Sequence, residues 1–305
     1  MLFRAFHSRT PALTRRGGFI RAGVFAVVFL VAAGRASAEW TPLLDDKLSQ
    51  WDTYLSFRHD TNYAGGEPVD AAGNKVPPVG YHTDPTRVFS IVQVDGQSAL
   101  RISGEIYGCL FTKQEFRNYR LRLKVKWGTA KADPRKDKLR DSGILYHSHG
   151  PAGVDYWRAW MLSQEFQIME GHMGDYWGIA NSSVDIRAFL PEGSMNSIAS
   201  DRQPFLPFGS KPSIAGLCLR SNDYESPAGE WTDLELVCFE GRSLHIVNGH
   251  VVMILKNSRA MHDGKAVPLV EGKIQLQSEA SEVFYRDIAI EPIDRMPAEY
   301  VRLFE

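Results

Sequence analysis

The chain has 305 residues, of which 44% are hydrophobic and 23% are charged, a composition typical of a globular protein. Its 35 basic and 36 acidic residues nearly cancel, so it lacks the basic excess that a phosphate-tracking nucleic-acid binder needs. Three cysteines allow at most one disulfide, for which Cys218 and Cys238 are the candidates, although a buried thiol is the commoner state.

Residues 1–38 have the composition of a secretory signal. They contain no Asp or Glu, and Arg residues precede an apolar run at residues 22–33 that is too short to span a membrane. Ala36-Ser37-Ala38 matches a small-x-small cleavage site, so we expect a periplasmic or secreted product that begins at Glu39. Loss of six Arg leaves a net charge of about −7. No second apolar segment predicts a membrane span.

Residues 39–305 have the periodicity of a single all-β domain. From Arg120 to Trp127 apolar and basic residues alternate, which is typical of a half-buried antiparallel strand. Further strands are predicted at residues 143–149, 162–169, 234–239, 244–247, 251–255, 274–277 and 283–290. Asn248-Gly249 predicts a type I′ hairpin turn. We therefore expect a sandwich of two antiparallel sheets.

Two segments rich in turn-forming residues interrupt these strands, at residues 60–85 and 191–213. In a sandwich such long connections are expected to form exposed flaps or rims over a binding face.

The strand at residues 162–169 has an unusual pattern. Phe166 and Ile168 point to one side, whereas Glu165 and Gln167 point to the other. Carboxylates are depleted in strands and costly to bury unless something binds them. A solvated outer face explains the pattern equally well on composition alone. What favours a ligand site is the set of aromatic and His residues on both flanks, namely His147, His149, Trp157, Trp160, Tyr176 and Trp177.

Blocks along the sequence resemble, in the same order, the 3-keto-disaccharide hydrolase family. The blocks are residues 39–44, 48–51, 116–123, 141–147, 163–170, 227–231, 247–249 and 272–279. They cover nearly the whole chain after the signal, and their common order is more specific than any single block. The resemblance implies a concanavalin-like jelly roll of two antiparallel sheets, with the ligand on the concave face.

The resemblance also implies substrates that are glycosides oxidised to a ketone at carbon 3. The ketone acidifies the hydrogen on carbon 2, so a base removes it and the aglycone leaves carbon 1. Addition of water then makes the enzyme a hydrolase, and without that step it is a lyase. The intermediate enolate needs hydrogen-bond donors or a cation, often a divalent metal ion. The expected partner is a small-molecule glycoside.

Several residues are candidates for this chemistry. His147 is expected to share a strand face with His149 beside Glu165, and so to act as the base or, together with Glu165, as a metal ligand. A lone strand His is more often structural. Gln167 is a candidate for binding sugar hydroxyls, and Glu279 for binding substrate from another strand. The aromatic candidates for substrate binding are Trp160, Tyr176 and Trp177.

Two other functions remain open from the sequence. Glu165 and Glu170 have the spacing of the two catalytic carboxylates of family-16 glucanases, where a bulge brings both onto one face for retaining hydrolysis. Gln167, however, replaces the Asp of that motif. The second alternative is a non-catalytic, lectin-like carbohydrate-binding module, which would need the same fold and aromatics but no base.

Overall fold

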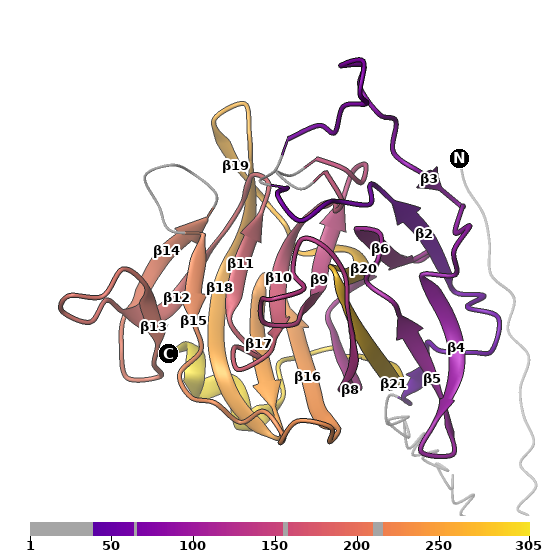
Figure 1. The fold of residues 1–305 in the computed structure, drawn as a ribbon. Helices are drawn as coiled ribbons and strands as arrows, with labels where there is room; N and C mark the ends of the chain where they lie inside the picture. Colours follow the sequence, from indigo (N-terminus) through magenta and orange to yellow (C-terminus); the bar gives the residue numbers. More distant parts are fainter. Residues whose placement is uncertain (1–38, 64–65, 155–157, 210–215) are drawn as a thin grey trace, which may run out of the picture. The chain divides into compact units, whose positions relative to one another are not determined.

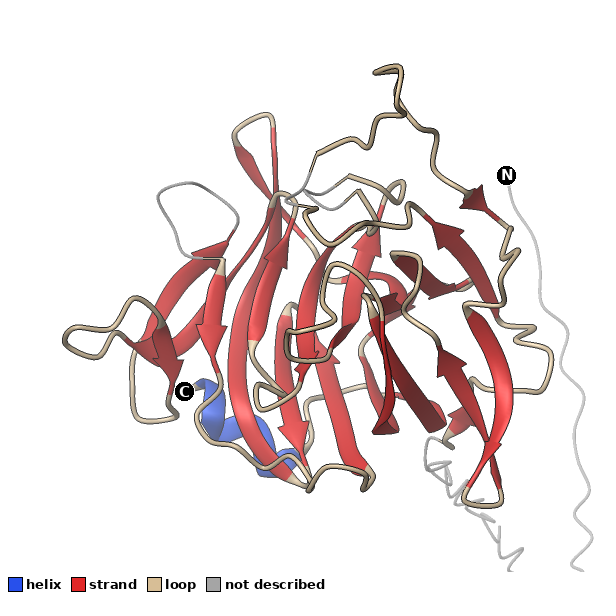
Figure 2. Ribbon diagram, in the orientation of Figure 1, coloured by secondary structure: helices blue, strands red, loops and turns tan. Residues whose placement is uncertain are grey.

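Strands dominate the computed structural model, which describes residues 39–63, 66–154, 158–209 and 216–305. Figure 2 shows strands throughout this part of the chain, together with one short 3₁₀ helix, η1 (Ala298–Phe304). The predicted signal and Trp157 lie outside the described residues. In the described residues, no helix is long and apolar enough to cross a membrane.

The first of two sheets has nine strands in the order β4-β5-β21-β8-β16-β17-β18-β12-β14. Their bounds are β4 (Phe89–Val94), β5 (Gln97–Ile102), β21 (Ser281–Pro292), β8 (Tyr119–Lys131), β16 (Thr232–Phe239), β17 (Arg242–Val247), β18 (His250–His262), β12 (Ser182–Phe189) and β14 (Phe205–Gly209). Two short strands extend it, β1 (Thr41–Pro42) on β21 and β19 (Lys265–Pro268) on β18.

The second sheet has the order β3-β2-β6-β20-β9-β10-β11-β15-β13, and β7 (Phe116–Arg117) pairs with the start of β20. The other bounds are β3 (Gly80–Tyr81), β2 (Trp51–Leu55), β6 (Gly108–Thr112), β20 (Glu271–Ser278), β9 (Asp141–His149), β10 (Leu162–Met169), β11 (Tyr176–Ile179), β15 (Leu217–Leu219) and β13 (Ser197–Ala199).

The two sheets share an edge, because β13 also pairs with the end of β12. In Figure 1, β9, β10 and β11 of the second sheet run beside one another, as the register requires. Among the described strands, β13 and β15 form a parallel pair and the other pairs are antiparallel. The predicted jelly-roll sandwich of two sheets is confirmed.

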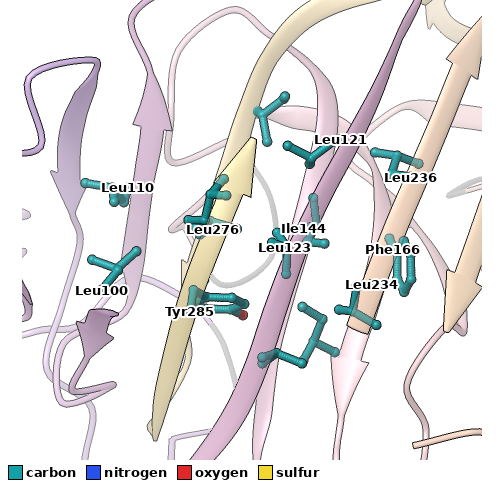
Figure 3. Close-up of a cluster of buried hydrophobic side chains, with 14 of the residues drawn as sticks. Leu100, Leu110, Leu121, Leu123, Ile144, Phe166, Leu234, Leu236, Leu276 and Tyr285 are labelled. Atoms are coloured by element: carbon teal, nitrogen blue, oxygen red, sulfur yellow. The ribbon is translucent and has the colours of Figure 1, made fainter. Parts of the chain in front are cut away.

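The core lies between the sheets, and Figure 3 shows its side chains meeting there. The first sheet contributes alternate residues such as Leu121 and Leu123 of β8, while the second contributes Ile144, Phe166 and Leu276 from β9, β10 and β20. Each is at most 3% exposed. Full burial of one such side chain stabilises the fold by about 1.5–3 kcal/mol, so the period-two pattern fixes which face of each strand turns inward.

The strands predicted from the sequence are confirmed. Asn248 and Gly249 have φ angles of 46° and 78°, as a type I′ turn requires. The segment 191–213 is only partly a loop, because it contributes β13 and β14, where Phe208 packs into a buried apolar cluster. Cys218 and Cys238 are buried free thiols, not a disulfide.

Candidate active site

The second sheet has two faces of different character. Ile144 and Phe166 point between the sheets, so Gly143 of β9 and Glu165 of β10, which alternate with them, point away from the core. A Cβ atom added at Gly143 would overlap the Glu165 Oε1 and Gln277 Oε1 atoms. These two side chains therefore converge over Gly143 from the neighbouring strands β10 and β20. We call this side of the second sheet the outer face.

A group of buried polar side chains occupies the outer face. We call Asp141, Glu165, Gln167, Gln277 and Glu279 the polar cluster; each is 7% exposed or less. The register places Gln167 opposite Gly143, and a bridge pairs Asp141 with Glu279. The three central strands, β20, β9 and β10, thus bring the cluster together from segments far apart in the sequence.

Arg135 joins two of the carboxyl groups. Its Nη2 atom lies 2.5 Å from Asp141 Oδ2, and its Nη1 atom lies 3.5 Å from Glu279 Oε1. Burial raises the pKa of Glu279 to about 7, against the opposing effect of the Arg135 charge. Burial, and then the neighbouring Glu279 carboxylate, raise the pKa of Asp141 well above its usual value. Glu279 can therefore take up or release a proton near neutral pH, while Asp141 holds its proton to a higher pH than an ordinary carboxyl group does.

Several polar atoms of this region are buried without a hydrogen-bond partner among the described residues. They are Gln167 Oε1, Gln277 Oε1, Asp141 Oδ1 and Arg135 Nε. A buried polar group left unsatisfied costs about 1–3 kcal/mol, and such groups in native proteins call for an explanation. A ligand rich in hydroxyl groups would supply the donors that the three oxygen atoms lack.

An apolar cluster adjoins the polar one on the outer face. It includes Tyr107, Leu145 and Trp160, and Leu145 lies directly opposite Glu165. Trp160 was predicted to bind substrate, but its side chain is only 3% exposed and its Nε1 atom donates to the Gly108 carbonyl at 3.1 Å. Trp160 therefore supports the outer face from within this cluster.

His147 does not lie beside Glu165, so the expectation of a shared strand face is wrong. His147 has a φ of 53°, and the pairing of β9 with both neighbours shifts register around it. This bulge breaks the alternation and turns the ring inward, where it is 6.3 Å from the Tyr119 ring and 5.1 Å from the Tyr146 ring.

The surroundings of His147 suit neither a base nor a metal ligand shared with Glu165. Burial lowers its pKa to about 3, and neither ring nitrogen has a hydrogen-bond partner in the described residues. A metal ion held by His147 and Glu165 together does not fit, because the two side chains are on opposite faces of the sheet. The described residues contain no group of three His, Cys, Asp or Glu side chains that could hold a metal ion.

The remaining predicted residues divide between the two faces. Tyr176 lies opposite Phe166 and turns inward, where its hydroxyl donates to Gln164 Oε1 at 2.7 Å, so the prediction that it binds substrate is wrong. Trp177 lies opposite Glu165 on the outer face and is 39% exposed. Of the three aromatic candidates, Trp177 is the one placed to meet a ligand.

Glu170 lies apart from the polar cluster. The register between β9 and β10 runs without a bulge from Gln164 to Met169, and Glu170 N then donates to the Arg140 carbonyl. Its side chain pairs with Arg140 at 2.9 Å. Because regular alternation turns Glu165 and Glu170 to opposite faces, the glucanase arrangement does not fit this strand, and Glu170 is not a catalytic candidate.

Comparison with known families agrees with this geometry. A family model described as the 3-keto-alpha-glucoside-1,2-lyase-like domain matches residues 39–291. The chain belongs to this family. The predicted resemblance is thereby confirmed, and the chain is a member of a carbohydrate-active family. No curated protein matches the sequence.

Solved structures of low identity match much of the chain. A candidate glycosyl hydrolase from Parabacteroides distasonis ATCC 8503 is 18% identical, with a TM-score of 0.44 over 84% of this chain and 100% of that chain. A carbohydrate-binding module from Bacillus subtilis is 8% identical, with a TM-score of 0.37 over 67% and 91% of the chains. A family-16 endo-beta-1,3(4)-glucanase is 13% identical, with a TM-score of 0.40 over 85% and 92%.

The sequence analysis did not identify three residues of the candidate site in this family member, namely Arg135, Asp141 and Gln277. Gln277 carries the same signal as Glu165, since Gln275, Gln277 and Glu279 alternate with the core residues Ile274 and Leu276. Asp141 alternates in the same way with Ser142 and Ile144. Arg135 gives no periodic signal, because it lies in the connection between β8 and β9.

Proposed function

We propose that the polar cluster cleaves glycosides that carry a ketone at carbon 3, by removing the proton on carbon 2 and eliminating the aglycone from carbon 1. The observation that supports this most strongly is a buried pair of carboxyl groups, Asp141 and Glu279, that share Arg135 and lie beside amide oxygens without a partner in the described part of the chain. Burial raises the pKa of Glu279 to about 7, as a base for this reaction requires. The family supplies the substrate class, and the cluster supplies a base suited to it.

Two carboxyl groups of the outer face can accept and donate the protons that the elimination moves. The Glu279 carboxylate takes the proton from carbon 2, and the electron pair of that bond forms the enolate of the ketone. The enolate then collapses to a carbon 1–carbon 2 double bond as the bond to the aglycone oxygen breaks. Asp141, whose raised pKa keeps a proton available, protonates the leaving oxygen. Water added to carbon 1 afterwards gives the hydrolysis product.

The other members of the cluster hold the sugar. Gln167 and Gln277 each have an oxygen atom, without a partner among the described residues, that accepts hydroxyl protons, and their amide groups carry N–H donors for the enolate oxygen. Glu165 converges with Gln277 over Gly143 and accepts a further sugar hydroxyl. Because Gly143 has no side chain, the ends of Glu165 and Gln277 can meet over it and present their oxygen atoms together.

A pair of substrates tests the proposal. The protein without residues 1–38 is incubated with methyl 3-keto-glucoside and with methyl glucoside, and the release of methanol and of the enone is measured. We expect turnover of the ketone alone, a primary isotope effect when carbon 2 carries deuterium, and loss of that deuterium to solvent. A chelator arm tests whether a divalent metal ion takes part.

Each alternative outcome has a distinct meaning. Turnover of the unoxidised glucoside would contradict elimination and support ordinary glycoside hydrolysis. Binding of both glucosides without turnover would instead support the lectin-like module. Turnover that is lost on chelation and restored by a divalent ion would add a metal to the mechanism.

The proposed location follows from the sequence. We propose that the protein acts in the periplasm or outside the cell, because residues 1–38 have an Arg-rich, acid-free start and a small-x-small site. N-terminal sequencing of the protein from its native source should find Glu39 first. Retention of Met1 would contradict export with cleavage.

A further inference from the structure

The outer face continues from the polar cluster onto an apolar surface. Trp177 of β11 lies directly opposite Glu165, and Leu217 of β15 lies directly opposite Trp177. Side chains opposite each other on neighbouring strands share a face and contact one another. The row Glu165, Trp177 and Leu217 therefore leads from a carboxylate of the proposed site to side chains that carry no polar group other than the indole N–H.

The apolar surface extends to the shared edge of the sheets. Leu219 lies two residues after Leu217 on the same face, Ile198 of β13 lies opposite Leu219, and Phe189 of β12 lies opposite Ile198. We call these five residues, Trp177, Leu217, Leu219, Ile198 and Phe189, the apolar track. The residues that alternate with them point into the buried core, namely Tyr176, Cys218, Ala188 and Ala199.

The apolar track is more open than the polar cluster. Trp177 is 39% exposed and Phe189 is 38% exposed, and the three aliphatic residues between them are half-buried. The acidic group that precedes Trp177 already has partners. Asp175, two residues before Trp177, accepts from Arg220 N at 2.8 Å and lies 3.1 Å from His172 Nδ1. A row of apolar side chains that reaches a proposed active site is a binding surface for an apolar group.

We propose that the apolar track is the subsite for the aglycone, and that the preferred substrates carry an extended aryl or alkyl aglycone instead of a second sugar. This inference rests on the proposed function of the polar cluster. The occupant follows from continuity, since the outer face leads from the polar cluster past Glu165 to Trp177, and an extended aglycone on carbon 1 can follow it. A second sugar would need hydrogen-bonding groups around the aromatic ring, and the four described residues of the track beyond Trp177 have apolar side chains.

A homologous series of alkyl 3-keto-glucosides tests the track. Primary alcohols longer than ethanol are nearly equal as leaving groups, so differences between butyl and octyl substrates report binding of the chain. Each buried CH₂ is worth about 0.8 kcal/mol, or up to ~4-fold in kcat/KM. We expect kcat/KM to rise at least about 10-fold from butyl to octyl. Trp177→Ala should flatten this rise, and Leu217→Ser, one strand further from the polar cluster, should flatten it while the rate with the methyl substrate changes little.

Val267→Ser is the matched control, because Val267 is an exposed aliphatic residue on β19, outside the track, and its replacement should leave the rise intact. If the methyl substrate is turned over but kcat/KM does not rise from butyl to octyl, the track is not the aglycone subsite, and the proposed function is unaffected. A 3-keto-disaccharide preferred over the octyl substrate would also overturn it.

A binding measurement keeps the two proposals separate. If no 3-keto-glucoside is turned over, the proposed function fails, and calorimetry with octyl glucoside below its micelle concentration still tests the track. Octyl glucoside should bind at least about 10-fold more tightly than methyl glucoside, and Trp177→Ala should remove the difference. Equal affinity for the two glucosides would overturn the inference.

Discussion

Two glutamines on one strand face opposite sides of the second sheet and differ in their partners. Gln164 donates through Nε2 to the Ser183 carbonyl at 3.0 Å and to Ser258 Oγ at 3.1 Å, and its Oε1 accepts from Tyr176 at 2.7 Å. Gln167 is also buried, but its Oε1 has no partner among the described residues. Burial alone therefore does not mark a functional residue. What distinguishes the outer-face glutamine of this strand from the inner one is an amide oxygen without a partner among the described residues.

The largest expected effect tests whether the outer face is catalytic. Glu279→Gln should lower turnover of a 3-keto-glucoside by roughly 100-fold or more, the usual contribution of a positioned base. Glu271→Gln is the matched control, because Glu271 begins the same strand, β20, with an exposed side chain. Its activity should stay within about 2-fold of the parent. If Glu279→Gln keeps more than a third of the parent activity, Glu279 is not the base.

The pH dependence of the reaction gives a second test. The base must be ionised, so kcat/KM should rise as the pH increases through about 7, the pKa of Glu279. Arg135 holds this pKa down, and replacement by Met should move the rising limb to higher pH. A pH profile of the parent and of Arg135→Met, on the same substrate, measures the shift. A limb that moves to lower pH in the variant would contradict the assigned role of Arg135.

A smaller effect is expected from Gly143→Ala, which acts on the outer face alone. The φ of Gly143 is not in the left-handed region, so Ala fits the backbone, but its Cβ would displace the ends of the Glu165 and Gln277 side chains. We expect roughly a 10-fold loss of kcat/KM. The free energy of unfolding should change by less than about 1 kcal/mol, because flexible side-chain ends can move. A large loss of stability with normal activity in the remaining folded protein would place Gly143 in a structural role.

Substitution of each glutamine separates the effect on stability from the effect on activity. Gln164→Leu removes three hydrogen bonds, two of them to the first sheet, and should lower the free energy of unfolding by about 2–4 kcal/mol. Gln167→Leu removes an unsatisfied oxygen and should be neutral or stabilising, with activity lowered about 10-fold. Urea denaturation and kcat/KM measured on both variants give the four values. Equal losses of stability would show that the outer face is as structural as the inner one.

The sequence predicted the sheets better than it predicted the site. Strands such as residues 120–127 were identified because burial of one face imposes period two on the side chains. The same rule placed Glu165 and Gln167 on one face and would have placed Gln277 there. Arg135 has no such signal, since only the fold brings the connection after β8 to the end of β20. Contacts of this kind depend on tertiary structure and not on spacing.

The bulge at His147 explains the main error. Period two predicted that His147 would share the face of Gly143 and Leu145, which holds only in a strand without an extra residue. His147 has a positive φ, which is uncommon for residues other than Gly. Nothing in the local sequence shows this, because the register shift arises from pairing with β10 and β20.

His147 has the smallest expected effect on turnover and a clear effect on stability. His147→Phe should change the turnover rate by less than about 2-fold, because the ring lies between the sheets beside Tyr119 and Tyr146. Its pKa of about 3 in the folded state is below the ordinary value of 6.5. The unfolded chain therefore binds a proton between pH 6.5 and 3 that the folded chain does not, and stability is lost as the pH falls through this range.

The variant should remove part of that acid sensitivity. His245 is also buried with a pKa of about 3, so His147→Phe should reduce the loss of stability between pH 6.5 and 4 without abolishing it. Urea denaturation at both pH values, on the parent and the variant, measures the difference. Unchanged acid sensitivity would show that His147 is protonated equally in both states. Turnover could instead fall by roughly 100-fold, as for a lost base, while stability stayed normal. His147 would then take part in catalysis, and catalytic residues would not be confined to the outer face.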